Sequence, residues 1–255
     1  MMERYALWEN ESYGKTEICV YRPVKSAGGT CIVIFPGGGY SHHAAHEGEG
    51  YASLLTAHGF TAAVVNYRVA PNRFPLPLLD ARRAVRFMRA NAEKFGIAPD
   101  KILVMGSSAG GHLAALVSTY KEGIEGEGAD AIDAADFLPN GQILCYPVIS
   151  SDESVSHKGS YQNLLGERYG ERAAFSPELL VDEKTPKAFL WHTAEDAAVN
   201  VINSYRYAAA LRTAGVPCEM HILPYGPHGL GTAVSDPYNA RWCEWLIAWL
   251  RAEFK

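Results

Sequence analysis

The sequence lacks any long apolar run. Its longest apolar stretches are Cys31 to Phe35, Thr61 to Val65 and Trp245 to Leu250, far below the roughly 18 residues of a membrane-spanning helix. The chain begins Met-Met-Glu-Arg, with an early acidic residue and no apolar segment behind it, so we expect no secretory signal in it. It also contains no repeat and no low-complexity tract. We therefore expect no membrane partner.

Positive charge is scarce. The 255 residues include 23 lysines and arginines against 28 acidic residues, a net charge of −5. Such a chain lacks the basic face that binding to phosphate backbones requires, which excludes nucleic acid as the expected partner. With 48% apolar and 11% aromatic residues, the composition is globular and excludes disorder for most of the chain. The length fits one large α/β domain over residues 1–255.

Cysteines are few and form no recognisable framework. The five, an odd number, are widely spaced and include no C-x-x-C pair: Cys19, Cys31, Cys145, Cys218 and Cys243. This usage predicts buried thiols in a reducing compartment rather than disulfides or a metal site. The predicted location is therefore cytoplasmic. The sequence does not fix the oligomeric state, and a homo-oligomer is compatible with it.

Short apolar runs alternate with longer helical patterns. The runs that predict strands are Thr30–Phe35, Thr61–Tyr67, Lys101–Met105, Gln142–Ile149, Ala188–Trp191 and Cys218–Leu223. The patterns that predict helices are Gly48–Gly59, Leu78–Phe95, Ala109–Tyr120, Asn203–Ala214 and Asp236–Glu253, the last with Asp236 as its cap and Pro237 at its first position. This order predicts an α/β fold with a mostly parallel central sheet and helices on both faces.

Three segments do not follow this alternation of predicted strands and helices. The first 28 residues suggest two strands, Tyr5–Trp8 and Thr16–Tyr21, as an antiparallel edge. Residues 121–140 are predicted to form a loop. Residues 150–186 make a 37-residue connection, and so long an insertion in a compact domain often serves function.

The chemistry is concentrated in Gly106-Ser107-Ser108-Ala109-Gly110, between a predicted strand and a predicted helix. This is the G-x-S-x-G pattern in its strand–turn–helix context, in which Ser108 sits on a tight turn and the flanking glycines leave room for it. The spacing does not match that of a phosphate-binding loop. We interpret Ser108 as a nucleophile, which needs a base and an orienting carboxylate.

Candidates for these partners follow in the order acid, then base. Glu195 and Asp196 follow the strand at 188–191; only one of them can reach the base, and we favour Asp196 for its place in the loop and its shorter side chain. His228, flanked by Pro227 and Gly229 just past the last strand, is the predicted base.

Other histidines receive other interpretations. His112 is expected to pack beneath the serine turn, and the remaining ones to be structural: His58, His192 and His221. His42, His43 and His46 resemble a metal cluster, but no thiol or well-spaced carboxylate completes it. We therefore expect these three histidines to lie in a polar loop near the entrance to the active site, and we expect no bound metal. Gly37, Gly38 and Gly39 follow the first apolar run, and two backbone N–H groups there, with that of Ala109, are suited to stabilising an oxyanion.

Together these segments resemble the α/β-hydrolase superfamily, in its branch of hormone-sensitive-lipase-like and acetyl-xylan-type esterases. The motifs that carry the resemblance are PGGGY at 36–40, NYRVAPNRFPLPLLD at 66–80, GSSAGGHLAA at 106–115, TAEDAAV at 193–199 and GPHGLG at 226–231. The resemblance implies Ser108, Asp196 and His228 as the triad and the N–H groups of Gly38, Gly39 and Ala109 as oxyanion donors. It also implies Tyr40 as a substrate-binding residue that lines the acyl pocket.

Two features depart from the family pattern. Pro36 stands where the family usually has a histidine before its glycines. Only 35 residues precede Pro36, so we expect the N-terminal cap of many lipase-like members to be missing. This favours an open site. The stretch SHKGSYQNLLGE at 156–167 resembles the insertion of small acetyl esterases.

The resulting hypothesis is a serine carboxylesterase that needs no cofactor. Its partner would be a small-molecule ester with a short acyl chain, such as acetyl groups on sugars or xylo-oligosaccharides. A peptidase, an amidase or an arylformamidase-type hydrolase on the same triad is the alternative. A non-catalytic scaffold would require a broken triad.

Overall fold

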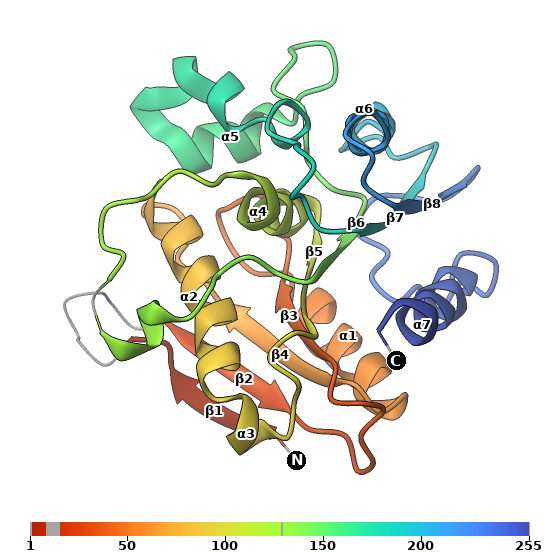
Figure 1. Ribbon diagram of the computed structural model, residues 1–255. Coiled ribbons are helices and arrows are strands. Elements are labelled where there is room, and N and C mark those ends of the chain that lie inside the picture. Colours follow the sequence, from red (N-terminus) through yellow and green to blue (C-terminus); the bar gives the residue numbers. More distant parts are fainter. Residues whose placement is uncertain (1, 9–15, 129, 255) are drawn as a thin grey trace.

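The computed structural model describes residues 2–8, 16–128 and 130–254 and contains a central sheet with helices on both sides (Figure 1). The strand order among these residues is β1-β2-β4-β3-β5-β6-β7-β8. The last six strands in this order are parallel, whereas β1 and β2 form an antiparallel edge. The strands are β1 Met2–Ala6, β2 Glu17–Tyr21, β3 Cys31–Phe35, β4 Thr61–Asn66, β5 Ile102–Ser107, β6 Gly141–Cys145, β7 Ala188–Thr193 and β8 Cys218–Leu223.

Two sets of helices cover the sheet. The helices are α1 Ala45–Ala57, α2 Leu76–Ala90, α3 Ala92–Phe95, α4 Ser108–Thr119, α5 Lys158–Leu165, α6 Ile202–Thr213 and α7 Arg241–Glu253. Apolar residues of α1 and α7 form one core, and those of α2, α4 and α6 form the other. Strand β5 contributes to both, because Leu103 and Met105 face the first core while Ile102 and Val104 face the second. The predicted sheet with helices on both faces is confirmed.

Two local expectations were wrong. The predicted helix 78–95 is split into α2 and α3 at Asn91. The last helix begins at Arg241 rather than at Pro237. Residues 237–240 form a separate turn, in which the Asp236 carboxylate accepts the N–H groups of Tyr238 and Asn239.

The predicted loop 121–140, of which the structure describes all but residue 129, neutralises charges buried on α2. The guanidinium of Arg83 is buried and pairs with Asp130 and Asp133, and that of Arg82 pairs with Glu127 at 3.0 Å. A buried charge is tolerated only when it is paired and hydrogen-bonded. These pairs therefore fix the loop onto the helix.

The C-terminal end of the chain closes one edge of the core. The Thr30 hydroxyl, just before β3, donates a hydrogen bond of 3.0 Å to the Phe254 carbonyl. At Gly141, the first residue of β6, an added Cβ would lie 2.7 Å from the Phe254 ring. The last residues thus pack directly beneath the central strands.

All five cysteines are free thiols. Cys19, Cys31 and Cys145 are buried, and burial raises the pKa of Cys145 to about 12. The prediction of unpaired thiols is confirmed. Among the described residues, no helix combines the length and the apolar character needed to cross a bilayer.

Candidate active site

Ser108 sits at the turn between β5 and α4. Its φ of 53° lies in the left-handed region, which is strained for a side chain larger than glycine. The flanking glycines are sterically required: a Cβ at Gly106 would lie 2.1 Å from the Gly110 carbonyl oxygen, and one at Gly110 would lie 2.0 Å from that of Phe35. The strained turn expected from the sequence is therefore present.

Three side chains from separate loops form a hydrogen-bonded chain. The Ser108 Oγ lies 2.9 Å from the His228 Nε2, and the His228 Nδ1 lies 2.6 Å from the Asp196 Oδ2. His228 lies beyond β8 and Asp196 lies beyond β7, at the same edge of the sheet as Ser108. This edge, at the carboxyl ends of the parallel strands, is where ligands bind in open α/β sheets.

The carboxylate of Asp196 is buried and accepts hydrogen bonds on both oxygens. Oδ1 accepts the N–H groups of Ala198 and Val199 at 2.9 Å each, and Oδ2 accepts His192 Nε2 at 3.2 Å in addition to His228. Burial alone would raise the pKa of Asp196, but these hydrogen bonds outweigh it and hold the pKa well below its usual range. The group therefore stays ionised next to His228.

Glu195 and His192, which lie close to Asp196 in the sequence, differ in their contact with it. Glu195 is exposed, whereas Asp196 faces His228. His192 was expected to be structural, but it touches Asp196; its Nε2 also faces the Val199 carbonyl at 3.0 Å, and its Nδ1 faces the Ser204 hydroxyl at 2.8 Å. The spacing of four residues between His192 and Asp196 was the only sequence signal for this contact.

The glycine loop after β3 lies beside Ser108. Gly38 and Gly39 have φ values of 127° and 62°, and a Cβ at Gly38 would lie 2.2 Å from the His42 carbonyl oxygen. Both glycines line the same cavity as Ser108 and His228. Ala109 occupies the first turn of α4, where backbone N–H groups have no acceptor within the helix. Gly38 and Gly39 thus share a cavity with Ser108, and Ala109 follows Ser108 directly in α4.

The cavity has a volume of about 400 Å³, and several polar side chains are among those that line it. His42 and His46 come from the glycine loop side, and His157 and Asn163 come from the 150–186 insertion. The His157 Nδ1 accepts the backbone N–H of Ser160, so its Nε2 carries the proton. Asn163 also donates to the Gly39 carbonyl at 2.8 Å, which attaches the insertion to the glycine loop.

Tyr40 differs from the expectation. Its side chain is buried, its hydroxyl lies 2.8 Å from the His112 Nδ1, and it is not among the residues that line the cavity. With φ at 58°, the backbone turns this ring inward, beneath the loop. His112 packs there as predicted, with its Nε2 2.8 Å from the Phe175 carbonyl.

The remaining histidines of the loop do not gather around one point. His42 Nδ1 contacts the Ser41 hydroxyl, His46 Nε2 contacts the Gly229 carbonyl, and His43 packs against the Tyr67 ring. Within the parts of the chain that the structure describes, no three metal-ligating side chains are grouped to hold an ion.

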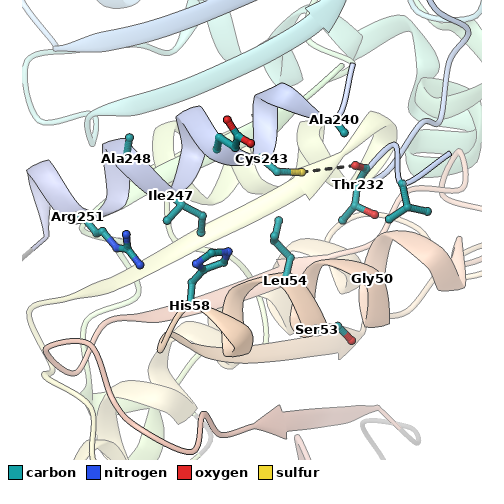
Figure 2. A pocket seen from close by; sticks show the side chains of 12 residues that line it. Gly50, Ser53, Leu54, His58, Thr232, Ala240, Cys243, Ile247, Ala248 and Arg251 are labelled. Carbon is teal, nitrogen blue, oxygen red and sulfur yellow. Dashed lines mark hydrogen bonds between the residues drawn. The ribbon is translucent and has the colours of Figure 1, made fainter. Parts of the chain in front are cut away.

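A second cavity, of about 670 Å³, lies between α1 and α7 (Figure 2). Its walls are largely apolar, with Leu54 on α1 facing Ile247 on α7, and the Cys243 thiol donates to the Thr232 carbonyl at 3.5 Å. Neither Ser108 nor His228 reaches it. We therefore assign the chemistry to the smaller cavity, which Ser108 and His228 line.

The burial of His112 predicts an acid-sensitive stability. Burial lowers its pKa to about 4, whereas an unfolded histidine has a pKa of about 6.5, so the unfolded chain binds more protons in this window. Stability is then lost as the pH falls from about 6.5 towards 4. Comparing urea unfolding at pH 7 and pH 4.5, the wild type should lose about 2 kcal/mol more than His112→Gln. Equal losses in the two proteins would contradict this assignment.

Comparisons with known proteins agree with this geometry. The model of the BD-FAE family matches residues 18–211. An endo-1,4-beta-xylanase B of Butyrivibrio fibrisolvens is 37% identical over 83% of this chain and 34% of its own length. An acetylxylan esterase of Xylanibacter ruminicola is 34% identical over 94% of this chain and 48% of its own length. The chain thus spans between a third and a half of these curated relatives.

A solved structure matches more completely. The acetyl ester-xyloside bifunctional hydrolase of Caldicellulosiruptor lactoaceticus superimposes with a TM-score of 0.91 and 40% identity, over 98% of this chain and 96% of that one. With the family model covering most of the sequence and the fold shared over nearly its full length, the chain belongs to the BD-FAE family and has the α/β-hydrolase fold.

Proposed function

We propose that this protein is a serine carboxylesterase that removes short acyl groups, above all acetyl, from sugar hydroxyls. The observation that carries the proposal is the hydrogen-bonded chain of Ser108, His228 and Asp196, of which Ser108 and His228 line one cavity. The names of the relatives support the substrate class, since one is an acetylxylan esterase and another an acetyl ester-xyloside hydrolase. The free, mostly buried thiols support a reducing, cytoplasmic location.

The proposed reaction has two halves. The Ser108 hydroxyl attacks the ester carbonyl while His228 Nε2 takes its proton, and the N–H groups of Gly38, Gly39 and Ala109 stabilise the oxyanion. His228 then returns the proton to the departing sugar oxygen, which leaves acetyl-Ser108. Water repeats the sequence and releases acetate. Asp196 fixes the imidazole orientation and stabilises its positive charge, and no cofactor is needed.

The cavity favours a small acyl group and a polar alcohol. The side chains that line the cavity include His42, His157 and Asn163, which can form hydrogen bonds with a sugar alcohol. Each CH₂ that finds apolar cover gains about 0.8 kcal/mol, so a site without an acyl tunnel would give no gain in kcat/KM with acyl chain length. The Nε2–H of His157 is suited to a sugar hydroxyl oxygen.

The test is a series of p-nitrophenyl esters from two to eight carbons, with acetylated xylo-oligosaccharides alongside. We expect kcat/KM not to rise along the series, because methylenes that stay uncovered gain no transfer free energy, and we expect acetate to be released from the oligosaccharides. A maximum at eight carbons without acetate release would refute the proposal. Faster cleavage of formanilides or peptide nitroanilides than of acetate esters would favour the amidase or arylformamidase alternative.

A further inference from the structure

Glu47, in the first turn of α1, is a buried acid for which the proposed reaction has no use. Its side chain is 3% exposed, and both carboxyl oxygens are bonded. Oε2 accepts the Gly37 N–H at 2.7 Å, and Oε1 accepts the Tyr146 hydroxyl at 2.7 Å. Gly37 directly precedes the two glycines assigned as oxyanion donors. Glu47 therefore fixes one end of the glycine loop at residues 37–39, which we call the oxyanion loop.

Tyr146 connects the same carboxylate to the histidine loop. Its hydroxyl accepts the Gly231 N–H at 2.9 Å, three residues after His228. Its ring meets the His228 ring edge-on, with 5.0 Å between the ring centres. The φ of Tyr146 is 36°, a strained value that its surroundings must hold in place. One tyrosine thus supports both the ring and the loop of the proposed base.

Tyr51 extends the contacts to the serine turn. It lies one helical turn after Glu47, and its hydroxyl lies 3.1 Å from that of Tyr146 and 2.7 Å from the Ser107 hydroxyl. Ser107 immediately precedes Ser108. The three loops that must meet for the reaction are therefore joined by one buried group of side chains: Glu47, Tyr51, Ser107 and Tyr146.

The proton positions in this group follow from the donors. Backbone N–H groups can only donate, and Tyr146 gives its single proton to Glu47. Tyr146 must then accept from Tyr51, and Tyr51 must accept from Ser107. Every proton points towards the carboxylate. An amide at position 47 breaks this arrangement, because its NH₂ group would have to donate to Tyr146 and the hydroxyl protons of Tyr146, Tyr51 and Ser107 would have to reverse.

We propose that Glu47 is a positioning residue, which through Gly37 and Tyr146 sets the oxyanion loop and His228 relative to Ser108. This inference rests on the proposed function. Glu47 is among the residues that line the cavity, but its side chain is only 3% exposed and both carboxyl oxygens are bonded to the protein. Its loss should therefore affect the transition state more than substrate binding. A displacement of reacting groups by about 1 Å can lower a rate by roughly 10²-fold.

The experiment compares Glu47→Gln, Tyr146→Phe, the double variant and Tyr207→Phe. Tyr207 is the matched control: it is also buried, and its hydroxyl donates at 2.9 Å to the Gln142 side chain, which is not part of the site. The measurements are kcat and KM for p-nitrophenyl acetate, the rate of serine labelling by an organophosphate, and the melting temperature of each protein.

Glu47→Gln should lower kcat and the labelling rate by about 10²-fold with KM unchanged. Tyr146→Phe should act in the same direction, and the double variant should lose less than the product of the two single losses because the residues are coupled. Tyr207→Phe should lower only the melting temperature.

A folded Glu47→Gln protein with wild-type kcat, or a control that loses as much activity, would overturn the inference; if Glu47→Gln does not fold, Tyr146→Phe decides by the same criteria. An inactive wild type would instead refute the proposed function.

Discussion

Ser108→Ala is expected to lower kcat for p-nitrophenyl acetate by about 10⁵-fold or more, since the nucleophile and its base act as a unit. The backbone at residue 108 keeps its φ of 53° with either side chain, because alanine meets the same steric limits as serine. The melting temperature should therefore hardly change. An organophosphate should label Ser108 in the wild type, as read by mass spectrometry of the modified peptide.

Ser118→Ala is the matched control for this substitution. Ser118 lies on the same helix α4, is also buried, and donates its hydroxyl to the Ala114 carbonyl at 2.9 Å. Its loss should leave kcat unchanged. Label on Ser107 instead of Ser108 would mean that the wrong serine has been assigned.

Asp196→Asn should have the next largest effect, about 10⁴-fold in kcat, as when a triad histidine loses its orienting carboxylate. All four contacts of Asp196 are with hydrogen-bond donors or imidazole nitrogens: Ala198 N, Val199 N, His192 Nε2 and His228 Nδ1. An asparagine must turn its NH₂ group towards two of them. The imidazole of His228 would then lose its orientation or adopt the wrong tautomer.

Glu195→Gln is the control, since this exposed neighbour differs from Asp196 by one position in the same loop. It should retain nearly full activity. Steady-state kinetics on both proteins, with melting temperatures to verify folding, decide between the two acids. The reverse ranking would show that Glu195 orients the base.

The sequence was sufficient for residues whose requirements are local. Backbone atoms lie within 2.1 Å of the positions that Cβ atoms of Gly106 and Gly110 would occupy, so both positions require glycine. The five residues around Ser108 were therefore enough to predict the turn. The parallel strands could also be predicted, because strands that are buried on both faces consist of unbroken apolar runs. The order of acid and base along the chain then located Asp196 and His228.

The sequence was insufficient where a role depends on contacts between distant segments. Glu47 resembles an ordinary surface acid of an amphipathic helix, and only the fold brings Gly37 and Tyr146 to it. Tyr40 follows a glycine run that suggested a pocket wall, but its left-handed backbone turns the ring towards His112. Residues 150–186 could be placed near the site by length alone, but not their individual contacts.

The position of Phe254 has a consequence for how the fold tolerates shortening. Phe254 covers the ends of β3 and β6, because its carbonyl accepts the Thr30 hydroxyl at 3.0 Å and its ring lies against Gly141. A chain shortened to end before Phe254 would therefore expose the apolar ends of these strands, and such species are prone to aggregate.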